Sequence, residues 1–169
     1  NDFGTGVKPG KPDDNSDVSF TGAVRKLCRG LKEKYPHGDI VFVLPIDRYD
    51  REGEHGYPLS LYRDILRKIA GEEYRFTVID GGRFGINASD PDFVTKHMKD
   101  GVHPDPVGQR IYADGVIEAL TSDKQHRTVY DNLYLKGTKI MKTVKDRYIL
   151  MGADFAGFPL KEAVAEHLR

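Results

Sequence analysis

The sequence predicts an α/β domain built around a parallel sheet. Two apolar segments, 39–46 and 75–80, have the length and composition of strands, and a segment of helical periodicity lies between them. Parallel strands need such a crossover, so we expect these two strands to be adjacent or near neighbours running in the same direction. The first segment is apolar from Ile40 to Ile46, the expected strand, and this is typical of a strand buried on both faces.

The elements before and between the strands follow in order. Residues 4–17 are rich in Gly, Lys, Pro and Asp and predict an exposed loop. A helix is expected over 20–35, where the apolar residues at helical spacing are Phe20, Val24, Leu27, Leu31 and Tyr35. After a polar loop at 47–57, a second helix is expected over 61–69, on the pattern of Leu61, Ile65, Leu66 and Ile69.

The domain is expected to end in a helix over 106–120. A loop at 81–90 and one or two helical turns at 91–98 precede it. Asp105 is a good N-cap, and Pro106 suits the first helical position. The apolar face expected for this helix comprises Val107, Ile111, Tyr112, Val116 and Leu120. Ligands of α/β sheets bind beyond the carboxyl ends of the strands, so the loops after both strands are candidates for a site.

The totals argue against several function classes. The 169 residues contain 26 Lys+Arg and 26 Asp+Glu, and a net charge of zero argues against a nucleic-acid partner. No apolar run approaches the ~20 residues of a membrane span. The six His show no paired ligand spacing, so we expect no metal site, and no motif indicates a cofactor. The oligomeric state is left open.

Cys28 is the single cysteine of the chain. It lies beside the apolar stripe of the first expected helix, so we interpret it as a packed small residue and not as a nucleophile. One cysteine excludes an internal disulfide and fits a reducing compartment, which slightly favours the cytoplasm.

An acid and an imidazole three residues apart form the main chemical signal. Asp100 and His103 lie in the turn before the last helix. A carboxylate can hold the Nδ1–H of such a ring while Nε2 faces a substrate, so we expect the two side chains to be hydrogen-bonded or within about 4 Å. The alternative interpretation is an ordinary capped surface turn.

Two segments resemble conserved blocks of the SGNH (GDSL-like) hydrolase family: Asn1-Asp2-Phe3-Gly4 and Asp100-Gly101-Val102-His103-Pro104. That family ends its third block in Gly-x-Asn-Asp and carries Asp-x-x-His-Pro in its fifth, so the resemblance covers about residues 1–121. It implies the C-terminal part of a flavodoxin-like, three-layer parallel sheet. It also implies a serine esterase or acylhydrolase that hydrolyses carboxylic esters, small or carbohydrate-linked.

The resemblance gives each matched residue a role. His103 is the base that takes the proton of a nucleophilic serine, Asp100 orients its ring, and the Asn1 amide donates to the developing oxyanion. The Gly-Asp-Ser block of the family is not in the chain, and none of the five serines has its setting. The chain does not begin with Met and ends inside an expected helix, so we expect a fragment that is inactive alone.

The composition changes after residue 121. A polar linker at 122–145 leads to an expected strand at 147–151, a tight turn at 152–157 and a helix that begins at Pro159. Residues 146–169 resemble the N-terminus of the ribose-5-phosphate isomerase B / galactose-6-phosphate isomerase family, through Gly152-Ala153-Asp154-Phe155-Ala156-Gly157. This resemblance implies the first βα unit of a second, Rossmann-like α/β domain.

The second resemblance assigns sugar binding to Asp154, while Phe155 stands where that family usually has His. The expected organisation is a partial hydrolase domain over 1–121, a linker over 122–145 and the start of an isomerase-like domain over 146–169. Two alternatives to the esterase therefore stay open: a sugar-phosphate isomerase and a truncated, inactive reading-frame product.

Overall fold

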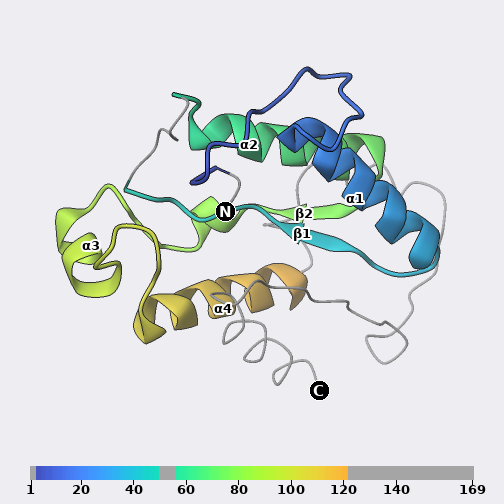
Figure 1. Cartoon of the computed structure of the whole chain (residues 1–169). Coiled ribbons are helices and arrows are strands. Elements are labelled where there is room, and N and C mark those ends of the chain that lie inside the picture. Colours follow the sequence, from blue (N-terminus) through green and yellow to red (C-terminus); the bar gives the residue numbers. More distant parts are fainter. Residues whose placement is uncertain (1–2, 50–55, 122–169) are drawn as a thin grey trace. The chain divides into compact units, whose positions relative to one another are not determined.

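The computed structural model describes residues 3–49 and 56–121, which form a mixed α/β structure (Figure 1). The elements are α1 (Phe20–Lys34), β1 (Val41–Val43), α2 (Leu59–Leu66), the π-helix η1 (Arg67–Glu73), β2 (Thr77–Ile79), the 3₁₀ turn η2 (Gly81–Arg83), α3 (Pro91–His97) and α4 (Pro106–Thr121). Their order follows the predicted alternation of helix and strand. The strand, turn and helix predicted within 147–169 lie outside the described residues.

The two strands pair in parallel, as predicted. The amide of Thr77 donates to the carbonyl of Ile40 at 3.1 Å, and the amide of Leu44 donates to the carbonyl of Ile79 at 2.8 Å. Both bonds advance along the two segments in the same direction, which is the parallel pattern. A three-layer sheet of the flavodoxin type stays a prediction.

The first strand is less buried than its composition suggests. Every residue of β1 is half-buried, whereas the flanking Ile40 and Leu44 are 8% and 0% exposed. The prediction of burial on both faces is therefore wrong for β1. An apolar run records which side chains can be buried, but the elements packed around a strand decide which of them are.

Contacts divide the described residues into two compact units, 3–42 with 56–78 and 43–49 with 79–121. In the first unit α1 packs against α2 and η1 (Figure 1). The ring of Tyr62 meets the rings of Phe3 and Phe20 edge-on, with centroids 5.5 and 4.9 Å away. Its hydroxyl donates to the carbonyl of Val7 at 2.5 Å. These contacts hold the N-terminal loop against the helices.

The helix predicted over 61–69 continues further than its periodicity indicates. α2 ends at Leu66 and η1 carries the chain to Glu73, where the amide of Tyr74 bonds the carbonyl of Ile69 at 3.0 Å. This five-residue hydrogen bond widens the turn, so a search at the α-helical period does not find it. Arg75 then adopts a left-handed φ of 60° and ends the helix.

A partly buried ion pair joins α1 to η1. Arg25 is 9% exposed, and its Nε and NH2 atoms donate to the two carboxylate oxygens of Glu73 at 2.8 and 2.7 Å. The same guanidinium donates to the carbonyl of Pro12 at 2.8 Å. A two-pronged bond between opposite charges is among the stronger side-chain interactions. It fixes the loop before α1 as well as the two helices.

The buried face of α1 is rotated from the predicted one. Phe20 and Val24 are buried, but Leu27 is 52% exposed and Cys28 is fully buried in its place. Both positions follow Val24 at helical spacing, and the location of the packing partner selects Cys28. The complete burial of Cys28 agrees with the expectation of a packed small residue, and the same burial raises the pKa of its thiol to about 12.

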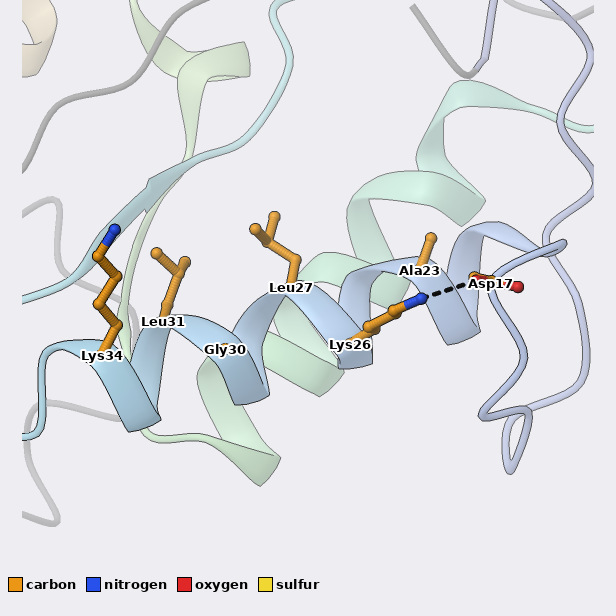
Figure 2. Close-up of a pocket in the computed structure, with 7 residues that line it drawn as sticks. All are labelled: Asp17, Ala23, Lys26, Leu27, Gly30, Leu31 and Lys34. Atoms are coloured by element: carbon orange, nitrogen blue, oxygen red, sulfur yellow. Dashed lines mark hydrogen bonds and ion pairs between the residues drawn. The ribbon is translucent and has the colours of Figure 1, made fainter.

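An open, mostly apolar hollow lies along the outer side of α1 (Figure 2). Leu27 and Leu31 lie along it, and at one end Lys26 forms an exposed ion pair with Asp17 at 2.7 Å. The hollow holds no histidine and no acid–base pair of the kind that hydrolysis needs.

The core of the second unit contains Ile86, Ala88 and Met98. Residues packed against it are Ile46, Phe93, Val94, Ile111 and Tyr112. In α4 the buried residues are Gly108, Ala113, Val116 and Ala119, while Val107 is 52% exposed. The prediction of Val107 on the apolar face is therefore wrong, because small residues bring α4 close to its neighbours and larger ones lie beside the contact.

No helix among residues 3–49 and 56–121 is long and apolar enough to cross a membrane.

Gly115→Ala tests the close contact in α4. A Cβ at 115 would lie 2.5 Å from the ring of Phe84, whereas a Cβ at Gly30 meets nothing within 4 Å. Alanine favours helix by about 0.5–1 kcal/mol over glycine, so Gly30→Ala should stabilise the chain. Gly115→Ala should lower the free energy of unfolding by about 1–3 kcal/mol through overpacking. Chemical denaturation measures both, and a stabilised Gly115→Ala variant would contradict the contact.

Glu73→Ala tests the ion pair of the first unit. Removal of this carboxylate leaves the Arg25 charge buried and unpaired, so the free energy of unfolding should fall by about 1.5–3 kcal/mol. Asp17→Ala removes the exposed partner of Lys26 and is the control, with no measurable loss expected. Equal losses in the two denaturation curves would count against a structural role for the partly buried pair.

Candidate active site: the turn between α3 and α4

The turn at 98–105 is held between two capped helices. The side chain of Asp90 accepts a bond from the amide of Asp92 at 2.9 Å and caps α3, with Pro91 in the first turn. Asp105 Oδ1 accepts from the amide of Gly108 at 2.9 Å and caps α4, as predicted. Asp105 therefore fixes the end of the turn where α4 begins, whereas Asp90 holds the opposite end of α3.

Asp100 and His103 are hydrogen-bonded across this turn, as predicted. Asp100 Oδ2 lies 2.7 Å from His103 Nδ1. Asp100 Oδ1 accepts from the amides of Val102 at 2.9 Å and His103 at 2.7 Å. The tautomer that satisfies the ring bond carries its proton on Nδ1, so Nε2 bears the lone pair. Asp100 thus fixes both the backbone and the ring of His103.

These bonds shift the titration of the acid. Donation from the backbone amide of His103, followed by donation from its ring, lowers the pKa of Asp100 from 3.8 to about 2. Asp100 is therefore ionised at neutral pH, when it can orient an imidazole and stabilise an imidazolium. The side chains of His103 and Asp100 are 60% and 56% exposed, so the pair is open to a reactant.

Gly101 has no room for a side chain. Its φ of 73° is left-handed, and an added Cβ would lie 2.9 Å from the Cβ of Tyr49. The amide of Tyr49 donates to the carbonyl of Gly101 at 2.9 Å, and the amide of Gly101 donates to the carbonyl of Met98 at 2.7 Å. Met98 is fully buried, so the middle of the turn is anchored in the core.

A second acid–imidazole pair, which sequence reasoning missed, lies at the base of the turn. His97 Nδ1 lies 3.1 Å from Asp105 Oδ2, and the amide of Asp105 donates to the carbonyl of His97 at 2.8 Å. The amide of Gly108 is the largest cause that lowers the pKa of Asp105. The capping pattern predicted that Asp105 caps α4, which uses one of its carboxylate oxygens. No local spacing predicts that His97 is the partner of the other oxygen.

The two pairs differ in exposure. His97 and Asp105 side chains are 27% and 33% exposed, against 60% and 56% for His103 and Asp100. The ring of His97 also lies 5.2 Å from the ring of Phe93. The Asp100–His103 pair is thus the better placed to exchange a proton with a bound molecule.

Asn1 and Asp154 lie outside the described residues, so their roles stay predictions. Ser19 is 5% exposed and its Oγ accepts from the amide of Gly22 at 3.2 Å, so it is the N-cap of α1. Within residues 3–49 and 56–121, no cluster of three His, Cys, Asp or Glu side chains could hold a metal ion.

Comparison with known proteins gives a fold and no family. No protein-family model and no curated protein matches the chain. One crystal structure is 25% identical, with a TM-score of 0.63, and covers 69% of this chain and 57% of its own. Another, of a protein from Lactobacillus plantarum, is 22% identical, with a TM-score of 0.67, and covers 73% of this chain and 64% of its own.

This chain therefore spans less than two thirds of either similar structure. The likenesses describe the fold of the chain and leave its activity to be proposed from the site.

The titration of Asp100 tests this geometry. A depressed folded-state pKa stabilises the fold above the ordinary value of 3.8, and this stabilisation is lost as the pH falls through about 2. A carboxyl carbon titration by NMR should give an Asp100 pKa of about 2. His103→Gln keeps the backbone amide bond and removes the ring bond, so the pKa of Asp100 should rise only part of the way back to 3.8. Full return to 3.8 would show that the ring alone is responsible.

Proposed function

We propose that this chain is the part of an SGNH (GDSL-like) serine esterase that carries the acid and the base. The observation that carries the proposal is the 2.7 Å contact between Asp100 Oδ2 and His103 Nδ1, in a turn that opens a capped helix. A carboxylate on Nδ1 with Nε2 left for a substrate is the arrangement by which serine hydrolases activate their nucleophile. The order Asp-x-x-His-Pro of the family supports the same assignment.

The reaction follows from the chemistry of the pair. His103 Nε2 accepts the hydroxyl proton of a serine outside residues 1–169 as that oxygen attacks the ester carbonyl. The resulting imidazolium, stabilised by ionised Asp100, returns the proton to the departing alcohol. Water then attacks the acyl-enzyme with the same proton transfers, which releases the acid and restores the serine.

Asn1 would donate its side-chain amide to the oxyanion of each tetrahedral intermediate. Loss of one such donor costs about 10²–10³ in kcat. The substrates we propose are small carboxylic esters or esters of carbohydrates. This substrate class rests on the family resemblance.

His103→Ala tests the proposal in the longer parent protein. The parent should hydrolyse p-nitrophenyl acetate, and His103→Ala should lower kcat by about 10⁶, as loss of a triad base does. His37→Ala is the control and should keep full turnover, because His37 is an exposed histidine just after the end of α1. Residues 1–169 alone should be inactive, because without the nucleophile the pair can activate water only weakly.

Three outcomes would contradict this assignment. A parent without esterase activity would exclude the function. Retained turnover in His103→Ala, with an unchanged melting temperature, would exclude the base. Strong esterase activity of residues 1–169 alone would show that a serine within the chain is the nucleophile.

A further inference from the structure

Asp100 orients His103 within the turn, but this exposed pair does not hold the turn itself in place on the rest of the unit. Ion pairs and hydrogen bonds at the surface contribute about 0–1 kcal/mol, and both of these side chains are more than half exposed. A base must nevertheless be held closely, since a displacement of about 1 Å can cost about 10²-fold in rate. The position of His103 must therefore be set by the segment that carries it, which is the turn at 98–105.

The base of that turn is closed by two contacts between the same residues. The amide of Asp105 donates to the carbonyl of His97 at 2.8 Å, and His97 Nδ1 meets Asp105 Oδ2 at 3.1 Å. The first contact belongs to the backbone. The second is made by side chains and uses a carboxylate oxygen that the helix cap leaves over, since Oδ1 alone serves the amide of Gly108.

The surroundings of this bridge keep it rigid. The ring of His97 lies 5.2 Å from the ring of Phe93, which packs against the buried core of the second unit. A Cβ added at Gly108 would lie 2.7 Å from the Cβ of Pro104, so α4 starts directly against the residue after His103. The side-chain nitrogen Nε2 of Gln109 also donates to the carbonyl of Pro104 at 3.1 Å. Because of these contacts, we expect a change at the base of the turn to move the segment that carries His103.

We propose that His97 and Asp105 are positioning residues whose side-chain bridge sets the direction in which Asp100 presents the imidazole of His103. The bridge touches no substrate and acts through the turn that it closes. As a statement about the reaction, this inference rests on the proposed esterase function. As a statement about the geometry of Asp100 and His103, it can be tested on the 169-residue chain alone.

Two substitutions remove the bridge from opposite sides. His97→Phe keeps a ring against Phe93 but removes Nδ1. Asp105→Ser keeps an N-cap, because a serine hydroxyl can serve the amide of Gly108, but it cannot also reach His97. Asp90→Ser is the matched control, since it makes the same change at the N-cap of α3, where the aspartate holds the amide of Asp92.

The first measurement is imidazole ¹⁵N NMR of His103 in the 169-residue chain. Both bridge variants should shift the Nδ1 and Nε2 resonances of His103 toward those of a ring that exchanges between tautomers. Asp90→Ser should leave them unchanged at a similar melting temperature. Unchanged His103 resonances in every bridge variant that folds would overturn the proposal. If only one of the two variants folds, its result decides.

The second measurement is esterase kinetics of the parent. Each bridge variant should lower kcat about 10–100-fold with little change in KM, while Asp90→Ser keeps kcat. Loss in His97→Phe as complete as in His103→Ala would overturn the proposal by making His97 the base. Shifted His103 resonances together with a parent that lacks esterase activity would reject the proposed function and leave the positioning role standing.

Discussion

Two aspartates accept hydrogen bonds from backbone amides in the turn between α3 and α4 and in the first turn of α4. Asp100 accepts hydrogen bonds from the amides of Val102 and His103, and Asp105 accepts one from the amide of Gly108. Each carboxylate has a second oxygen, and each gives it to a histidine Nδ1. The start of α4, the shape of the turn and the tautomer of both imidazoles therefore depend on the same local requirement for hydrogen-bond partners.

Close packing around glycine supports this arrangement in the second unit. A Cβ at Gly81 would lie 2.2 Å from the carbonyl oxygen of Leu44, and one at Gly101 would lie 2.9 Å from the Cβ of Tyr49. These glycines let the segment after β1 approach the segments that follow β2. The loops after both strands thus come together at the turn, which agrees with the general location of ligand sites in α/β sheets.

Two charge pairs with different surroundings lie in different units. Arg25 and Glu73 form a two-pronged, partly buried pair that holds the loop before α1 and the two helices together. Loss of either partner would leave the other charge without compensation, which destabilises the fold. Asp100 and His103 are mostly exposed, contribute little to stability and keep Nε2 for chemistry. Burial therefore separates the residues that hold the fold from those proposed to act.

Local patterns in the sequence determined much of what is observed. The strand–helix alternation, the parallel pairing, the N-cap at Asp105 and the Asp100–His103 bond all depend on short-range periodicity or on neighbours within a few residues, which a sequence displays directly. The SGNH-type chemistry, the roles of Asn1 and Asp154, and the domain division stay predictions.

The tertiary structure decided the rest. It selected Cys28 over Leu27 and small residues over Val107 for burial, because a helix at the surface of a core buries whichever side its partner covers. It widened the end of α2 into η1, where Glu73 reaches Arg25 across the unit. It also brought His97 to Asp105, since a contact between the end of one helix and the cap of the next depends on the path of the turn between them and has no sequence period of its own.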